Sequence, residues 1–132
     1  MAALGGAMKT VLVVDDSATL RRMVIASLQP LTDLKFHEAA NGLEAIERLS
    51  IESVQLIVLD LNMPDMHGME VVAFVRKHAA FHKVPIIVLT TRSDDEIRKA
   101  ALAAGATIFM TKPFKPNSLA DSARQLLDIH GS

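Results

Sequence analysis

The chain has no cysteine, no tryptophan and no tyrosine, and it has no apolar run of membrane-spanning length. Without cysteine, disulfide bonds and thiol chemistry are excluded and a reducing compartment is permitted, so we expect a cytoplasmic protein. Without tyrosine and tryptophan, the usual side chains that stack on a flavin are missing. The formal net charge of −1 gives no general reason to bind nucleic acid. We therefore expect neither membrane insertion nor direct nucleic-acid binding.

The remaining composition is that of one compact domain. The chain has 132 residues, of which 50% are hydrophobic and 22% charged, as in folded globular proteins. This length suits a single domain with a single core. The opening residues lack the basic region and the long apolar stretch of a secretory signal. We predict a flexible extension over residues 1–8 and one domain over residues 9–129.

Four apolar runs in the sequence each end abruptly in polar residues. Such continuous Val/Ile/Leu runs are typical of strands buried on both faces, in a parallel sheet covered by helices. Ligands of these sheets bind outside the carboxyl ends of the strands, where this chain has acids, a hydroxyl and an ammonium group. Clustered acids suit a divalent cation, and an aspartate can accept a phosphoryl group. The runs are VLVVDD at 11–16, LIVLD at 56–60, IIVLT at 86–90 and IFMTKP at 108–113.

Helical patterns lie between the strands and complete an α/β fold. We predict a doubly wound parallel sheet of five strands with five helices on its two faces. A short second strand is expected at 35–38, and the fifth strand at 107–110. Leu43, Ile46 and Leu49 recur at helical spacing and predict an inward face. Ser93 is the expected N-cap of the fourth helix, which should end at Gly105. The other helices are expected at 17–28, at 41–50, after Gly68 and at 117–128.

One set of strand-end residues resembles a known family. The chain resembles the receiver domain of bacterial two-component response regulators, and most closely the single-domain CheY-like members. This resemblance covers nearly the whole chain and implies the flavodoxin-like strand order 2-1-3-4-5. Each residue taken alone could be an ordinary turn or helix cap. The resemblance rests on Asp15 and Asp16, on Asp60 within DLNMPDMHG, on Thr90, and on Lys112-Pro113-Phe114.

The resemblance implies a role for each of these residues. Asp60 would accept a phosphoryl group from a histidine kinase or a histidine phosphotransfer protein. Lys112 and the Thr90 hydroxyl would contact the phosphoryl oxygens. Such a protein catalyses only its own phosphorylation and dephosphorylation, so we expect a signalling receiver and not an enzyme. Mg²⁺ is the implied cofactor, held by Asp15, Asp16, Asp60 and the backbone carbonyl of Asn62.

The resemblance also implies how the signal leaves the site. Thr90 and Phe109 would act as the switch, the threonine moving toward the phosphoryl group while the aromatic ring turns inward. The output surface would lie on the fourth helix, the fifth strand and the fifth helix, with Arg98, Leu102 and Phe109 as candidates. We expect no effector domain to follow, and therefore output by contact with a downstream protein, in chemotaxis or in a phosphorelay.

Three residues near the site are expected to set the lifetime of the phosphorylated state. Thr91 is β-branched, whereas the family more often has a small residue at this position. The larger side chain should restrict the access of water to the phosphoryl group. Arg92 is long and charged, and can lie over the phosphoryl group. Asn62 can orient a water molecule. We expect the effects of Thr91 and Arg92 to outweigh that of Asn62, so that hydrolysis of the phosphorylated state is slow.

Two other functions fit parts of the pattern. A Mg²⁺-dependent phosphatase with an aspartyl nucleophile would also place an aspartate at a strand end. Such enzymes, however, are expected to carry an Asp-x-Asp arrangement and often a cap, whereas Asp15 and Asp16 are adjacent. A flavodoxin-like carrier would share the architecture, but the turn DDSAT has paired acids where a phosphate-binding loop is expected.

Overall fold

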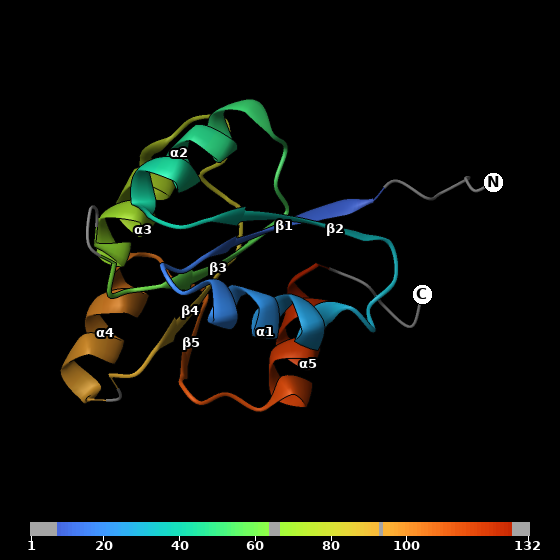
Figure 1. The fold of residues 1–132 in the computed structure, drawn as a ribbon. Coiled ribbons are helices and arrows are strands. Elements are labelled where there is room, and N and C mark those ends of the chain that lie inside the picture. The colour runs from blue at the N-terminus through green and yellow to red at the C-terminus, as the bar shows by residue number, and fades with distance from the viewer. Residues whose placement is uncertain (1–7, 64–66, 93, 128–132) are drawn as a thin grey trace.

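Strands and helices alternate along the chain, and the strands form one parallel sheet between two layers of helices (Figure 1). The computed structural model describes residues 8–63, 67–92 and 94–127. The sheet has five strands in the order β2-β1-β3-β4-β5, which confirms the predicted fold. The elements are β1 Lys9–Val14, α1 Ala18–Leu28, β2 Leu34–Ala39, α2 Gly42–Ile51, β3 Leu56–Asp60, α3 Gly68–Lys77, β4 Ile86–Thr90, α4 Asp95–Ala104, β5 Ile108–Thr111 and α5 Pro116–Leu126.

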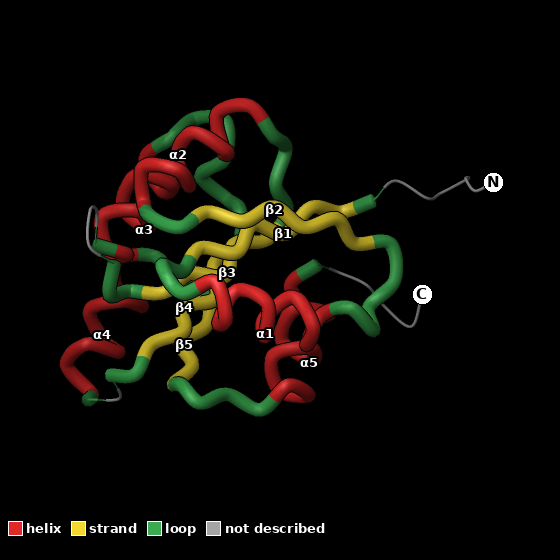
Figure 2. Tube along the Cα trace, in the orientation of Figure 1, coloured by secondary structure: helices red, strands yellow, loops and turns green. Residues whose placement is uncertain are grey.

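The central strands are buried along their whole length, as their apolar sequences predict. Every residue of β3 and of β4 is buried, including the polar residues that end them. The register pairs Asp60 with Leu89 and Thr90 with Thr111, so the carboxyl ends of β3, β4 and β5 lie next to one another. Figure 2 shows the strands running side by side between the helices. The sheet thus brings its polar strand ends to one edge.

Each face of the sheet is covered by its own set of helices. α1 and α5 pack on one face, where Val24, Leu28 and Leu119 join the apolar side chains of β1, β3 and β4. α2, α3 and α4 cover the other face, with Val72 and Ala101 in that second core (Figure 1). In the part of the chain that the structure describes, every helix is too short or too polar to cross a bilayer.

The inward face of α2 differs from the prediction. Leu43 is 57% exposed, so its predicted place in the core is wrong. Gly42 and Ala45 are buried in its place, together with Leu49. Small side chains let a helix approach the sheet closely, and this turns the larger Leu43 toward solvent.

Several boundaries are shifted by one or two residues. β5 begins at Ile108 and not at residue 107. The N-cap of α4 is Asp94, whose side chain accepts a hydrogen bond from the Ile97 N–H, so the prediction of Ser93 is wrong. Ser93 itself, residues 1–7 of the expected extension and residues 128–129 lie outside the described residues. The domain limits therefore stay predictions.

Arg76 ties three segments together at the amino edge of the sheet. From the last turn of α3, its side chain donates to the carbonyls of Gly105 at 2.9 Å, His82 at 2.9 Å and Val84 at 2.6 Å. Burial lowers the pKa of its guanidinium, which stays charged because an arginine pKa lies so far above neutrality. Gly105 ends α4 as predicted, with φ at 121°, a conformation that favours glycine. A Cβ there would also lie 2.7 Å from Arg76 Cγ.

Candidate functional site

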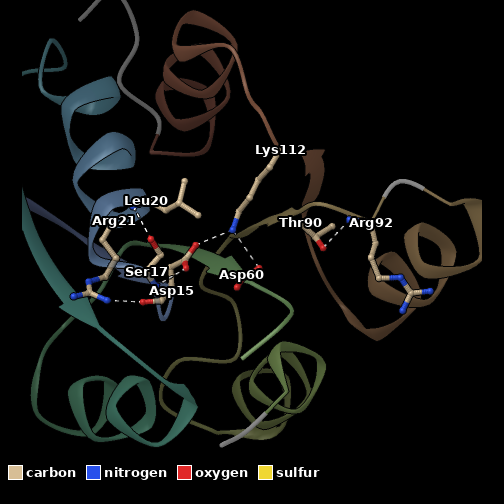
Figure 3. Close-up of polar contacts among 8 residues, drawn as sticks. All are labelled: Asp15, Ser17, Leu20, Arg21, Asp60, Thr90, Arg92 and Lys112. Atoms are coloured by element: carbon tan, nitrogen blue, oxygen red, sulfur yellow. Dashed lines mark hydrogen bonds and ion pairs between the residues drawn. The ribbon is translucent and has the colours of Figure 1, made fainter. Parts of the chain in front are cut away.

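Four polar side chains from four different strand ends converge at the carboxyl edge of the sheet (Figure 3). Asp15 follows β1, Asp60 ends β3, Thr90 ends β4 and Lys112 follows β5. Asp15, Asp60 and Thr90 are only 5%, 6% and 0% exposed. The Lys112–Pro113 peptide bond is cis. These are the residues that the sequence placed at one site, and the fold does bring them together.

Three carboxylates at this edge form a group that suits a divalent cation. One oxygen from each of Asp15, Asp16 and Asp60 lies within 4.8 Å of the others. Asp16 is exposed while its two neighbours are buried. Oxygen ligands are those that Mg²⁺ prefers, and an exposed ligand leaves room for the waters that this ion keeps. The donor set therefore fits Mg²⁺, with Asp15, Asp16 and Asp60 as its candidate ligands.

Lys112 places a positive charge beside two of these acids, Asp15 and Asp60. Its ammonium lies 2.9 Å from Asp15 Oδ2 and 3.4 Å from Asp60 Oδ1. The Lys112 side chain is only 10% exposed, and those of the two acids are 6% exposed. In this setting the ammonium partly neutralises both carboxylates, and it is nearer to Asp15.

The environment of Asp60 disfavours its charged form. Burial is the main reason that the pKa of the Asp60 carboxyl is raised above 3.8, and the nearby charge of Asp15 adds to the effect. Lys112 and a hydrogen bond from the Asn62 backbone act in the opposite direction and lower this pKa. A desolvated carboxylate is poorly stabilised by its surroundings, so a group that bonds to it or neutralises it gains free energy.

The loop after β1 is held by a dense set of hydrogen bonds around Asp15. Its backbone N–H donates to the Ala39 carbonyl at 3.1 Å. Its side-chain oxygen Oδ1 accepts from the Ser17 N–H at 2.9 Å. Ser17 in turn caps α1 by accepting from the Leu20 N–H at 3.2 Å. The helix thus begins immediately after the two acids and fixes the loop that carries them.

Two residues at this loop were not anticipated from the sequence. Arg21 Nη1 donates to the Asp15 carbonyl at 2.6 Å, and Arg21 Nε donates to Glu38 Oε1 at 2.7 Å. Glu38 lies near the end of β2, in register with Val13 of β1. The only signal in the sequence was an arginine in the second turn of α1, six residues after Asp15. Its partner could not be identified without the pairing of β1 with β2.

Thr90 is tied into the segment that follows it. Its hydroxyl oxygen accepts from the Arg92 N–H at 3.2 Å, and its carbonyl accepts from the Lys112 N–H at 2.8 Å. Thr91 is exposed. The Arg92 guanidinium points away from the acids and pairs with Asp94 at 3.4 Å (Figure 3). Arg92 therefore does not cover the carboxylates in this structure, and it would have to leave Asp94 to do so.

The candidate output residues lie on the side of the sheet formed by β5. Phe109 is half-buried and packs against the core beneath α4. Phe109 and Arg98 line a groove of about 390 Å³, which continues over Phe114 and Lys115. Leu102 is 39% exposed on α4. The groove joins β5 to the helices on either side of it.

Gly68 brings the start of α3 against the end of β3. The Gly68 N–H donates to the Leu61 carbonyl at 2.8 Å. A Cβ at this position would lie 2.5 Å from the carbonyl oxygen of Asp60 and 2.6 Å from Leu61 Cα, closer than real Cβ atoms come. Only glycine therefore lets α3 begin so close to the backbone of Asp60. Asn62, in the loop between them, is exposed.

The sequence and the fold are both similar to those of known signalling proteins. A family model described as the response regulator receiver domain matches residues 11–124. Chemotaxis protein CheY1 of Helicobacter pylori is 37% identical over 117 residues, which cover 88% of this chain and 94% of that protein. The chemotaxis protein CheY homolog of Campylobacter jejuni is 38% identical over 117 residues, which cover 88% of this chain and 90% of that protein. The structure of chemotaxis response regulator CheY4 of Vibrio cholerae is similar at a TM-score of 0.83 and 36% identity, covering 91% of this chain and 99% of that one.

Proposed function

The chain belongs to the response regulator receiver domain family, and we propose on this basis that it is a signalling switch phosphorylated on Asp60. The observation that carries the proposal is the place of Asp60. It ends a fully buried strand, its carboxylate lies among those of Asp15 and Asp16, and Lys112 faces it at 3.4 Å. A desolvated nucleophile between acids and a cation suits phosphoryl transfer.

The transfer step uses the Asp60 carboxylate as the nucleophile. A carboxylate oxygen attacks the phosphorus of a phosphohistidine on a histidine kinase or a histidine phosphotransfer protein. The new O–P bond forms as the N–P bond breaks, and the bonding electrons return to the imidazole nitrogen of the donor. Lys112 neutralises charge on the phosphoryl oxygens, and the Thr90 hydroxyl donates to one of them. The product is an acyl phosphate on Asp60.

The acidic cluster is the proposed site of Mg²⁺. Asp15, Asp16, Asp60 and the Asn62 carbonyl are the residues that would hold the ion. When bound, Mg²⁺ neutralises the negative charge of the phosphoryl oxygens and of the carboxylates beside them. The charges support this assignment, because Lys112 brings one positive charge to a group of three carboxylates, two of which are buried.

The switch is proposed to reset by hydrolysis of the acyl phosphate. Water attacks the phosphorus, the Asp60 carboxylate leaves, and inorganic phosphate is released. Between these events the groove that joins α4, β5 and α5 presents a changed surface to a downstream protein. The similarity to the two CheY chemotaxis proteins supports a cytoplasmic, chemotaxis-type regulator, and a phosphorelay role uses the same chemistry.

The test is phosphorylation with a small phosphodonor in the presence of Mg²⁺. Intact-protein mass spectrometry should detect one phosphoryl adduct, which hydroxylamine removes as expected for an acyl phosphate. Asp60→Asn should abolish the adduct because the amide is no nucleophile. Asp33→Asn is the matched control, since Asp33 is exposed directly before β2 and its φ of 61° suits asparagine. An adduct of undiminished yield in Asp60→Asn would contradict the proposal.

A further inference from the structure

Arg21 borders the candidate site, and the proposed function gives it no role. It lies in the second turn of α1, and its side chain is only 15% exposed. Its guanidinium makes two short hydrogen bonds, to the Asp15 carbonyl at 2.6 Å and to Glu38 at 2.7 Å. Figure 3 shows Arg21 and Lys112 on opposite sides of Asp15. Asp15 is therefore held by one cation at its carboxylate and by another at its backbone.

The two hydrogen bonds of Arg21 together hold the Asp15 carbonyl in place, and we call this pair of bonds the brace. A guanidinium is planar, and its donors have a fixed geometry, so the bond to Glu38 orients the nitrogen that holds the Asp15 carbonyl. Glu38 is anchored in β2, which pairs with β1 directly before the acidic loop. α1, β2 and the loop after β1 are thereby joined at one point. Without the brace, the loop keeps the bond from Asp15 to Ala39 and the turn at Ser17, but the carbonyl that precedes Asp16 is free to rotate.

We infer that Arg21, anchored by Glu38, is a positioning residue that sets the carboxylates of Asp15 and Asp16 for the divalent cation. The inference rests on the proposed function, because it takes these acids as the site of Mg²⁺. Arg21 itself would contact neither the cation nor the phosphoryl group. It acts by holding the peptide between the two acids, so that less order has to be gained when the ion binds.

Whether removal of Arg21 weakens or strengthens Mg²⁺ binding distinguishes a positioning role from a purely electrostatic one. Arg21 is a positive charge close to the acids, and a positive charge repels Mg²⁺. If Arg21 acted only through its charge, its removal would strengthen Mg²⁺ binding. If it acts as a brace, its removal weakens Mg²⁺ binding in spite of the lost repulsion. The two explanations therefore predict opposite changes in one measured quantity.

The experiment is a calorimetric titration of Mg²⁺ into the unphosphorylated protein. Arg21→Met keeps the length of the stem and removes both hydrogen bonds, and we expect it to weaken Mg²⁺ binding by about tenfold. Arg22→Met is the matched control, because Arg22 is the next residue, is exposed and shares neither of these contacts. We expect Arg22→Met to bind Mg²⁺ as tightly as the wild type or slightly more tightly.

Glu38→Gln tests the contact between Glu38 and Arg21 and changes no residue of the acidic loop. It weakens the hold on the guanidinium but leaves the bond to the Asp15 carbonyl, so we expect a smaller loss of Mg²⁺ affinity than in Arg21→Met. Amide hydrogen exchange of the metal-free protein provides a second measurement. The Ser17 N–H, which is bonded to Asp15, should exchange faster in both variants, while the amides of β3 and β4 should not change.

The outcomes distinguish this inference from the proposed function. A folded Arg21→Met that binds Mg²⁺ as tightly as the wild type, or more tightly, overturns the inference alone. If Arg21→Met does not fold, unchanged Mg²⁺ affinity and unchanged Ser17 exchange in Glu38→Gln overturn it. A wild-type protein that binds no Mg²⁺ and accepts no phosphoryl group overturns the proposed function together with the inference.

Discussion

The Lys112 ammonium donates a hydrogen bond to the Asp15 carboxylate at 2.9 Å, in a setting where both side chains are almost fully buried. This bond occupies an oxygen of one of the three acids that suit a divalent cation. A cation bound there must share Asp15 with the ammonium or displace it. On the proposed function, Lys112 would compete with the metal before phosphorylation, and after it both cations would neutralise the phosphoryl group.

This competition predicts opposite effects of Lys112→Met on binding and on chemistry. With the ammonium gone, the Asp15 carboxylate loses its ion pair with Lys112, so Mg²⁺ should bind about tenfold tighter, or ~1.4 kcal/mol. Phosphorylation of Asp60 should nevertheless become much slower, because one stabilising cation is lost. Calorimetry and the rate of adduct formation measure the two effects. Lys115→Met, an exposed neighbour with the same charge loss, is the control. Weaker Mg²⁺ binding in Lys112→Met would disprove the competition.

The raised pKa of Asp60 predicts that Asp60→Asn stabilises the metal-free protein at neutral pH. A pKa raised by burial means that the ionised carboxylate destabilises the folded state, and the neutral amide removes this cost. Lys112 keeps its bond to Asp15, so the gain should be on the order of 1 kcal/mol. The gain should shrink as pH falls through the raised pKa and vanish below 3.8, where Asp60 is protonated in both states. Urea denaturation in a chelator at several pH values measures it, and a gain that grows with acidification would refute the assignment.

Thr90 should separate phosphorylation from the response to it. Thr90 is fully buried and its hydroxyl accepts from the Arg92 N–H, so we expect a movement of Thr90 to shift the segment before α4. Thr90→Val keeps the shape and removes the hydroxyl. We expect this variant to accept a phosphoryl group but to lose most of the change at Phe109. NMR of the Phe109 ring before and after phosphorylation measures that change, and a wild-type response in the variant would exclude the coupling.

Thr91 and Arg92 should slow hydrolysis of the acyl phosphate, and the structure adds Asp94 to this prediction. Thr91→Ala and Arg92→Ala should each lose phosphate roughly twofold to tenfold faster, by ~0.4 to 1.4 kcal/mol of activation free energy. Asp94→Asn should act in the opposite direction, because asparagine also caps a helix but releases Arg92 from its ion pair. The decay of the adduct after removal of the donor gives all three rates. Unchanged or slower decay of the adduct in both alanine variants would show that Thr91 and Arg92 do not slow hydrolysis.

The parts of the site that follow from strand ends could be predicted from the sequence. Asp60 and Thr90 directly end buried apolar runs, and parallel strands bring such ends to one edge. The residues that approach this edge from helices could not be predicted in the same way. The contact of Arg21 with Glu38 depends on which strand lies beside β1, and that order came from the resemblance and not from the apolar pattern.

The sequence predicted some local details wrongly where several residues suit one position equally well. Ser93 and Asp94 can each cap a helix, and the chain uses Asp94. Leu43 has the spacing of a core residue, but the burial of Gly42 and Ala45 sets the orientation of α2. Sequence spacing predicts that a helix has an apolar face, and packing against the sheet decides which residues that face includes.

The bonds of Arg76 have a consequence for how α4 can move. The carbonyl of Gly105, at the carboxyl end of α4, accepts a hydrogen bond from Arg76, while Thr91, Arg92 and Asp94, between Thr90 and the amino end of the helix, are exposed. If α4 moves in the proposed switch, we therefore expect it to rotate about its carboxyl end, where Gly105 is held by Arg76. A displacement that starts at Thr90 would then swing the amino end of α4 and leave its carboxyl end in place.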